Sequence, residues 1–337
     1  MNNLFESIGL LMGRDPARPT PEEMTPSCRA LTAFKRTPEE VRTRKAKIQA
    51  EKDNPKTSHF WRNLRWGSII LVNMVFVVSY HFDIQMIEGA LTAARVFGFH
   101  FADLNSSLQV MLAHKNVVVN LLIGTVTVLG IYVMIGGRTF CSWICPYHIL
   151  SEWAEILHLK LAEKKLVSDR KLHRGTRTAL FLAFSLLAFA TGYTVYETIN
   201  PVGIVSRALT YGTIAGMIWV GILLLLEIVW SRRFWCRYIC PIGLIYGVAG
   251  IVSPVRIRHN AVLCLHEGKC RRVCLVPHVL EMTKLAHSKD IVSATGADCT
   301  RCGMCVDVCP TGALTFEVIG FTQPVKPWQG ASQEQGA

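Results

Sequence analysis

The chain has 337 residues, of which half are hydrophobic, and it carries a formal net charge of +12. A mean hydropathy of +0.30 is too high for an ordinary soluble globular protein. The positive charge fits either nucleic acid or an anionic membrane surface, and the positions of the basic residues decide between the two. No catalytic triad, P-loop or dinucleotide-binding fingerprint occurs, so the sequence does not point to nucleotide-dependent or nicotinamide-dependent enzymes.

Residues 1–65 form a polar arm with a proline-rich start, "RDPARPTPEEMTP". We expect this arm to be cytoplasmic, partly disordered and partly helical. Its helical part is "TPEEVRTRKAKIQAEK", where Thr37 can cap a helix that has Pro38 in its first position. Cys28 is predicted to be an ordinary cytosolic thiol. The polar beginning contains no apolar run of the kind found in a cleavable signal peptide.

Four apolar stretches follow the arm, at residues 66–82, 117–137, 178–198 and 213–230. Each has about the 17 to 25 residues that a helix needs to cross a bilayer. Buried core helices are the alternative, but stretches this long and nearly free of charge favour membrane spans. The sequence therefore predicts a polytopic α-helical membrane protein with four spans, whose membrane domain covers residues 66–250.

The basic residues orient these spans. Of the 36 lysines and arginines, 33 lie in residues 1–65, 138–177 and 231–337, and only three lie in the 83–116 and 199–212 connections. By the positive-inside rule, both termini and the middle connection are cytoplasmic, which predicts a multi-pass protein of the bacterial inner membrane. Topology then accounts for the positive charge, and no nucleic-acid partner is expected. We expect an amphipathic helix around "GALTAARVFGFHFADL" in the outer 83–116 connection.

The membrane domain contains an internal repeat of two helical hairpins, each followed by a cysteine motif. The motifs are "RTFCSWICPYHIL" and "RRFWCRYICPIGL", and both read aromatic-Cys-x-aromatic-Ile-Cys-Pro. Four cysteines result, which we call the membrane-edge cysteines: Cys141, Cys145, Cys236 and Cys240.

Residues four apart on a helix share a face, with Cβ atoms about 5–6 Å apart, which is too far for a disulfide but suits two thiolates on one metal. Pro146 and Pro241 push the preceding cysteine out of the helical conformation. We predict one shared site on the membrane-edge cysteines for a metal ion or an iron–sulfur cluster. Thiols that only pack the helix ends, and redox-active thiols, are the alternatives.

The chain ends in a cysteine-rich segment, residues 251–320, followed by a loose tail at 321–337. "CTRCGMCVDVCP" supplies Cys299, Cys302, Cys305, Cys309 and Pro310, which is the complete C-x2-C-x2-C-x3-C-P run of bacterial ferredoxins. An earlier run supplies Cys264, Cys270 and Cys274. A zinc ribbon is the alternative, but the spacing fits iron–sulfur clusters better. The sequence predicts a cytoplasmic, ferredoxin-like α+β domain with two clusters.

In two-cluster ferredoxins the fourth cysteine of each run binds the other cluster. Cys299, Cys302, Cys305 and Cys274 would then hold one [4Fe-4S] cluster. Cys264, Cys270 and Cys309 would hold a second, atypical cluster, because Glu267 stands where the run requires a cysteine. Since a carboxylate is a poor ligand for such a cluster, we expect a [3Fe-4S] or a labile [4Fe-4S] form there. His266 is the nearest alternative ligand.

The chain resembles a known family, the membrane-bound quinol dehydrogenase subunit NapH of periplasmic nitrate reductase systems, within a wider group that contains NosR. The resemblance runs from about residue 60 to 318 and rests on "FCSWICP", "INPVGIVSRAL", "WCRYICPIGLIYGV", "CRRVCLVPHVL" and "CTRCGMCVDVCP". It implies four membrane helices, cytoplasmic cluster motifs, and electron transfer from the quinol pool. The implied partners are ferredoxin-type proteins, multihaem cytochromes or periplasmic reductase subunits. Glu267 and the long arm depart from the family pattern.

These features favour an electron-transfer subunit of a quinol dehydrogenase. A membrane-bound copper reductase or assembly factor, and a redox-sensing regulator, are the alternatives. Quinol oxidation needs a proton acceptor, and ionisable groups at the outer ends of the helices are the candidates. They are Tyr80, His81, Tyr196 and Glu197, with Asp83, Tyr193 and Asn200 nearby. The aromatic belt at a membrane interface explains the tyrosines equally well.

Overall fold

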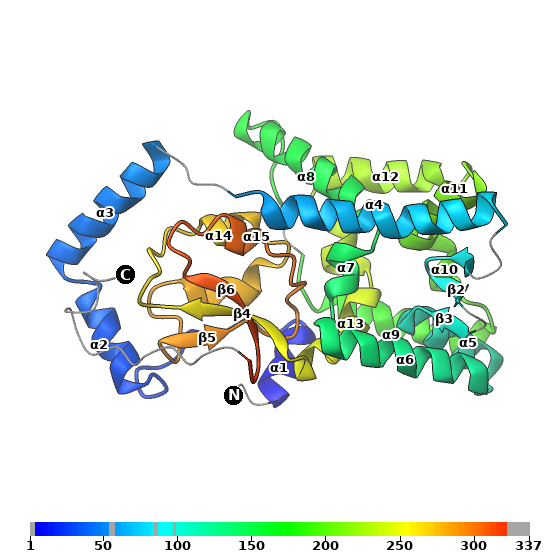
Figure 1. The fold of residues 1–337 in the computed structure, drawn as a ribbon, viewed down its shortest axis with the longest axis horizontal. Helices are drawn as coiled ribbons and strands as arrows, with labels where there is room; N and C mark the ends of the chain where they lie inside the picture. The colour runs from blue at the N-terminus through cyan, green and yellow to red at the C-terminus, as the bar shows by residue number, and fades with distance from the viewer. Residues whose placement is uncertain (1–3, 54–57, 84–86, 97–98, 171, 322–337) are drawn as a thin grey trace. The chain divides into compact units, whose positions relative to one another are not determined.

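A computed structural model describes residues 4–53, 58–83, 87–96, 99–170 and 172–321 (Figure 1). The chain forms two compact units. The helical unit consists of residues 1–14 and 64–253, and the α+β unit consists of residues 15–63 and 254–337. The structure thus divides the predicted arm between the two units. The predicted tail lies outside the described residues from residue 322 onward.

The helical unit contains the four apolar stretches of the sequence. Its helices are α1 (Leu4–Leu11), α4 (Phe60–His81, which begins in the α+β unit), α5 (Leu104–His114), α6 (Val119–Ile135), α7 (Thr139–Trp143), α8 (Tyr147–Glu163), α9 (Thr176–Thr191), α10 (Val195–Ile199), α11 (Pro201–Tyr211), α12 (Met217–Val229), the π-helical turn η1 (Trp235–Ile239) and α13 (Ile242–Val252). The four predicted apolar stretches fall on α4, α6, α9 and α12.

Among the described residues, α4 is the one helix that is long and apolar enough to cross a membrane by length and composition. The apolar helices α6, α9, α12 and α13 are shorter. The predicted stretch 178–198 is not a single helix, because Gly192 adopts a left-handed conformation (φ 69°) that ends α9. Large apolar side chains of these helices face outward, and examples are Leu71 of α4, Leu186 of α9 and Ile218 of α12, which are 67%, 69% and 71% exposed.

The prediction of an amphipathic helix around residues 89–104, in the 83–116 connection, was wrong. Instead of an amphipathic helix, the chain forms an antiparallel meander of β1 (Ile87–Ala90), β2 (Ala93–Val96) and β3 (Phe99–Ala102). Gly89, at φ +100°, lies in a left-handed conformation that disfavours a helix there. Helix α5 begins only after Asp103, whose carboxylate accepts hydrogen bonds from the backbone N–H groups of Asn105 and Ser106.

The core of the helical unit gathers around the two cysteine motifs. Tyr147, Tyr196, Trp235 and Tyr246 are each at most 2% exposed there. Gly137 brings α6 close to α13, since a Cβ atom on Gly137 would lie 2.4 Å from the backbone of Gly250. Burial of this aromatic cluster therefore fixes the positions of the motifs.

The α+β unit is built on a three-stranded antiparallel sheet. Its strands are β4 (Val255–Asn260), β5 (Val292–Ala294) and β6 (Leu314–Val318), in the order β5-β4-β6. Short helices carry the cysteine runs, and they are α14 (Lys269–Val273), the 3-10 helix η2 (Pro277–Thr283) and α15 (Met304–Asp307). Ile257, at the centre of the sheet, is fully buried against Leu280 and Leu314.

Two helices of the arm belong to this unit, namely α2 (Pro26–Phe34) and α3 (Pro38–Asp53). The predicted helix after Thr37 is confirmed as α3. Cys28 is not an isolated surface thiol, because it is 3% exposed and its Sγ donates to the Ser288 carbonyl oxygen at 3.4 Å. The arm thus supplies part of the hydrophobic packing of the α+β unit.

Candidate functional site

Four cysteines of the α+β unit line one cavity of about 320 Å³. They are Cys274, Cys299, Cys302 and Cys305. Each is less than 10% exposed, and the remaining lining is mostly apolar. Arg301, in a left-handed conformation at φ 50°, donates to the Cys299 carbonyl oxygen at 2.7 Å and so shapes the loop between two of the thiols.

The electrostatics of this first cysteine cavity suit a cationic metal centre. Burial raises the pKa of Cys305 well above its ordinary value, and the neighbouring thiols Cys302 and Cys274 raise it further. Burial and neighbouring thiols do the same to the pKa of Cys274. Thiolates, the form that binds iron, are therefore stable here only beside positive charge.

A second cavity, of about 400 Å³, is lined by Cys264, Cys270 and Cys309. His266 and Glu267 also line it. The structure thus places the seven cysteines of the two runs in two sets, and each set takes one cysteine from the other run. Within the described residues, no three His, Cys, Asp or Glu side chains are arranged to hold a single metal ion.

Glu267 and His266 differ in how their side chains are held. Glu267 Oε1 lies 3.1 Å from Lys269 Nζ, so this oxygen has a cationic partner, whereas Glu267 Oε2 is buried and has no hydrogen-bond partner. His266 Nδ1 lies 2.8 Å from the Thr283 carbonyl oxygen, which can only accept, so this nitrogen carries a proton. His266 Nε2 is buried and has no hydrogen-bond partner. This arrangement leaves a ring nitrogen with a lone pair, as in metal-binding histidines whose other nitrogen donates to a carbonyl.

The second cavity is also shaped by the arm. Lys35 is 2% exposed, and its Nζ donates to the carbonyl oxygens of Ala261, Val262 and Cys264, each at 2.7 Å. The ammonium group thereby holds the loop that carries Cys264. Nothing in the cysteine spacing indicates this role.

The two membrane-edge motifs share one backbone hydrogen bond at the second cysteine. The N–H of Cys145 donates to the Phe140 carbonyl oxygen at 3.1 Å, and the N–H of Cys240 donates to that of Trp235 at 2.9 Å. Both are i to i−5 bonds, a π-type turn that occurs often at functional sites. Cys240 then takes an extended conformation before Pro241 (ψ 110°). Each cysteine pair therefore spans a helix end, and not a continuing α-helix.

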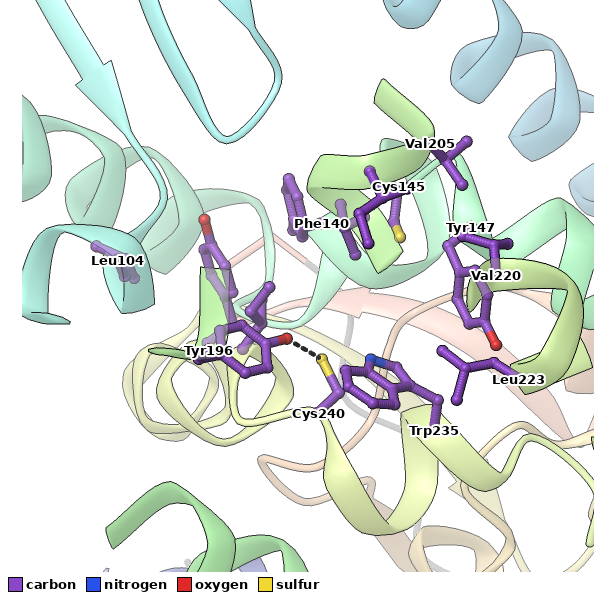
Figure 2. Packing of buried hydrophobic residues seen from close by; sticks show 14 of the residues in the cluster. Leu104, Phe140, Cys145, Tyr147, Tyr196, Val205, Val220, Leu223, Trp235 and Cys240 are labelled. Carbon is purple, nitrogen blue, oxygen red and sulfur yellow. Dashed lines mark hydrogen bonds between the residues drawn. The ribbon is translucent and has the colours of Figure 1, made fainter. Parts of the chain in front are cut away.

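The four thiols share one buried environment. Figure 2 shows Cys145 and Cys240 in the same aromatic cluster, and Cys141 and Cys236 pack against it. Burial raises the pKa of Cys145 well above its ordinary value, and the nearby Cys141 and Cys240 raise it further. These effects indicate that the thiols lie close enough to interact.

A buried arginine stands three residues before the first cysteine of each motif. Burial raises the pKa of Cys141 to about 11, while Arg138 opposes the rise through its charge and a hydrogen bond to the thiol. Arg233, which pairs with Glu155, likewise opposes the rise in the pKa of Cys236. Both arginines are at most 3% exposed. The repeat contained this signal in "RTFC" and "RFWC", but the arginines were not among the predicted site residues.

The structure does not bring the four predicted quinol-site residues together. Tyr80 is 54% exposed and packs against Tyr211, with ring centroids 4.9 Å apart. His81, also exposed, contacts the Val77 carbonyl oxygen of its own helix. Tyr196, by contrast, is fully buried, with its hydroxyl 3.5 Å from Cys240 Sγ (Figure 2).

Glu197 also points into the helical unit, where it accepts a hydrogen bond from the Ser106 hydroxyl at 2.6 Å. Of the four predicted residues, Tyr196 therefore lies beside a membrane-edge cysteine, Glu197 is partly buried next to Ser106, and Tyr80 and His81 lie on the surface.

Two family models match the chain, and both are described as a 4Fe-4S binding domain. The first matches residues 117–165 and 213–258, so each part contains one membrane-edge motif. The second matches residues 297–315, which contain the complete cysteine run. No solved structure matches the chain.

Characterised relatives cover most of the chain. The methylamine utilization ferredoxin-type protein MauN of Paracoccus denitrificans is 34% identical over 228 residues, covering 66% of this chain and 79% of the relative. MauN of Methylorubrum extorquens is 29% identical and covers 78% of this chain and 91% of the relative. The ferredoxin-type protein NapH of Escherichia coli is 29% identical and covers 76% and 91%. With this similarity along both units and its 4Fe-4S domains, the chain belongs to the family of ferredoxin-type iron–sulfur proteins that includes NapH and MauN.

Proposed function

We propose that this protein is a membrane-embedded electron-transfer subunit that takes electrons from the quinol pool and passes them through iron–sulfur clusters to a redox partner. One observation carries the proposal: both membrane-edge motifs lie within the residues matched by the family model of a 4Fe-4S binding domain. The apolar helices of the same unit expose large apolar side chains. A quinol is a membrane-soluble reductant, so an acceptor site within an apolar unit can receive its electrons directly.

The cysteines divide into three sets in this proposal. The first cavity would hold one [4Fe-4S] cluster, on Cys274, Cys299, Cys302 and Cys305. The second cavity would hold a [3Fe-4S] or [4Fe-4S] cluster, on Cys264, Cys270 and Cys309. The membrane-edge cysteines would hold a third centre. Clusters of this kind accept and donate single electrons at potentials that their ligands and surroundings set.

The protein supplies the surroundings of these centres. Buried apolar walls exclude water from the first cavity, and Arg138 and Arg233 place positive charge beside the membrane-edge thiols. A buried positive charge favours the reduced form of a nearby centre, because reduction adds negative charge. A centre on the membrane-edge cysteines would therefore accept electrons from quinol more readily than a centre on the same thiols in an uncharged apolar site.

The topology is part of the same proposal. We propose four spans, on α4, α6, α9 and α12, with both termini on the cytoplasmic side of the inner membrane. The distribution of lysine and arginine supports this orientation. A ferredoxin-type protein, a multihaem cytochrome or a periplasmic reductase subunit would be the partner.

The test uses the full chain purified in lipid nanodiscs under anaerobic conditions. With a [4Fe-4S] cluster as the third centre, we expect roughly 11 to 12 iron atoms per chain. We also expect a short-chain quinol to reduce the centres, and electron paramagnetic resonance measures this reduction. The Cys240→Ser variant should lose part of the iron and the quinol-dependent reduction. Reduction of Cu(II) without any oxidation of quinol would overturn the proposal in favour of a metal-ion reductase.

A further inference from the structure

A buried polar network runs through the helical unit from the membrane-edge cysteines to the first turn of α5. The Tyr196 hydroxyl lies 3.5 Å from Cys240 Sγ, and it donates to Asn200 Oδ1 at 3.4 Å. The Asn200 amide lies near the Glu197 carboxylate, and its Nδ2 is buried without a hydrogen-bond partner. The Ser106 hydroxyl donates to Glu197 Oε1 at 2.6 Å, so the network continues into α5.

Ser106 also links Glu197 to a second carboxylate, Asp103. The backbone N–H of Ser106 donates to Asp103 Oδ2 at 3.3 Å, and the Tyr246 hydroxyl lies near the same carboxylate, whose Oδ1 has no hydrogen-bond partner. Asp103 is 4% exposed, and Tyr246 is 1% exposed. One serine thus bridges a buried carboxyl group, that of Asp103, and a partly buried one, that of Glu197, and Tyr196 and Tyr246 lie nearby.

Helix α5, which carries Ser106, holds further buried polar side chains. Asn105, Ser107 and Gln109 on α5 are each 1% exposed, and each has a side-chain oxygen or nitrogen without a hydrogen-bond partner. Burial of such groups costs stability. In a unit with an apolar exterior, buried ionisable and polar residues are characteristic of proton pathways.

The groups that face the two carboxylates come from several neighbouring elements. They are Tyr246 from α13, Tyr132 from α6, Tyr196 from α10, Arg207 from α11, and Cys141 and Cys240 from the two motifs. Burial raises the pKa of Asp103 to about 7, and the charge of Glu197 contributes to this rise. A carboxyl group in this setting can bind and release a proton near neutral pH.

We propose that Glu197 and Asp103 form a proton-binding pair that gains one proton when the site on the membrane-edge cysteines gains one electron. The pair loses the proton when the electron leaves. This inference rests on the proposed function. An electron added near the pair makes the local potential more negative, so the carboxyl groups hold a proton more tightly.

The chemistry balances for a hydroquinone donor. Its oxidation breaks two O–H bonds and releases two electrons and two protons. The electrons leave singly to the iron–sulfur acceptor, and each proton passes to the carboxyl pair and then to water. Tyr196 and Asn200 are positioning residues in this scheme, because Tyr196 contacts both Cys240 and Asn200, and Asn200 lies near Glu197.

The experiment measures the reduction potential of the membrane-edge centre between pH 6 and pH 8, by redox titration in nanodiscs. The signal lost in Cys240→Ser identifies that centre. One proton per electron gives a potential that falls by about 59 mV for each pH unit. In the double variant Glu197→Gln and Asp103→Asn, we expect a potential that does not change with pH, because both amides keep hydrogen-bonding capacity but bind no proton.

Glu227→Gln is the matched control. Glu227 is also a fully buried carboxyl group near Cys236, but its partners are Tyr147, Ser151 and Trp235, outside the network. This variant should keep the wild-type slope. A wild-type slope in the double variant, or its loss in Glu227→Gln alone, would overturn the proposal.

Infrared difference spectroscopy provides a second readout. Reduction of the wild-type protein should produce a band from a protonated carboxyl group, and each single variant should weaken or shift that band. These single variants keep the test decisive if the double variant does not assemble. If Cys240→Ser removes no centre, the proposed function fails at this site. If the centre is present and its potential is independent of pH, only the proton pair is refuted.

Discussion

At the scale of single residues, the atypical run around Glu267 gives the sharpest prediction. The carboxylate is held by Lys269, so it is a weak candidate for binding iron. We expect the air-oxidised protein to show the signal of a three-iron cluster, because one iron without a strong ligand is lost easily. Glu267→Cys should restore a four-iron cluster and shift its potential, since thiolate ligands hold such clusters. Paramagnetic resonance and iron content measure both effects.

His266 is the alternative fourth ligand in the same cavity, and its binding would give a different result. If its Nε2 binds the fourth iron, the native site is a complete four-iron cluster with a nitrogen-derived hyperfine coupling. His266→Ala would then remove the coupling and produce the three-iron signal, whereas Glu267→Gln would leave both unchanged. A three-iron signal in the native protein, without nitrogen coupling, favours the absence of a fourth ligand.

The arginines before the membrane-edge cysteines lead to a second prediction. Arg138→Gln removes a positive charge that acts directly on Cys141. Because reduction adds negative charge, the potential of the centre should fall, by an amount on the order of tens of millivolts. Arg232→Gln is the control, since Arg232 pairs with Asp169 and Glu155. Equal shifts in both variants would mean that Arg138 has no specific effect.

At the scale of elements, the two motifs are predicted to act as one site. Cys145→Ser and Cys240→Ser each remove one thiol from a different motif. If all four thiols share a centre, either variant should lose the same iron, beyond the iron that the α+β unit binds. Unchanged iron, zinc and sulfide in both variants would show that the thiols only pack the helix ends.

Helix α2 gives a stability prediction at the same scale. Lys35→Met removes three hydrogen bonds to backbone carbonyls and leaves these acceptors buried. We expect a loss of about 2–3 kcal/mol in the free energy of unfolding of the α+β unit. Denaturant unfolding monitors this loss, and the cluster near Cys264 should be released earlier than the other. Lys45→Met, in α3, is the control, because Lys45 is exposed.

At the scale of the whole molecule, the distribution of charge predicts the topology. Reporter fusions after residues 65, 160 and 337 should indicate the cytoplasm, and fusions within 90–110 and 203–209 should indicate the outside. The physical reason is the near absence of lysine and arginine from the two outer connections. A C-terminal reporter on the periplasmic side would contradict the topology and the cytoplasmic location of the α+β unit.

The sequence by itself determined the features that depend on local spacing. Cysteine spacing identified the ferredoxin-type run at Cys299 to Cys309, and the 4Fe-4S match over that run agrees with it. The repeat of Cys-x3-Cys-Pro located the second group of thiols, and proline after cysteine predicted the helix end seen at Cys240. These features can be recognised in the sequence because ligand spacing and the conformational effect of proline each involve only a few neighbouring residues.

The remaining features of the fold and of the candidate site were decided only by the tertiary structure, because these features depend on contacts between distant segments. The β-meander in the 83–116 connection replaced an expected helix, since a left-handed glycine and the cap at Asp103 outweigh the apolar pattern. Lys35 contacts a loop more than 200 residues away, and Ser106 joins Glu197 to Asp103 across α5 and α10. Among the quinol-site candidates, burial separated Tyr196 and Glu197 from Tyr80 and His81. No local pattern in the sequence records which polar residue ends up buried beside which thiol.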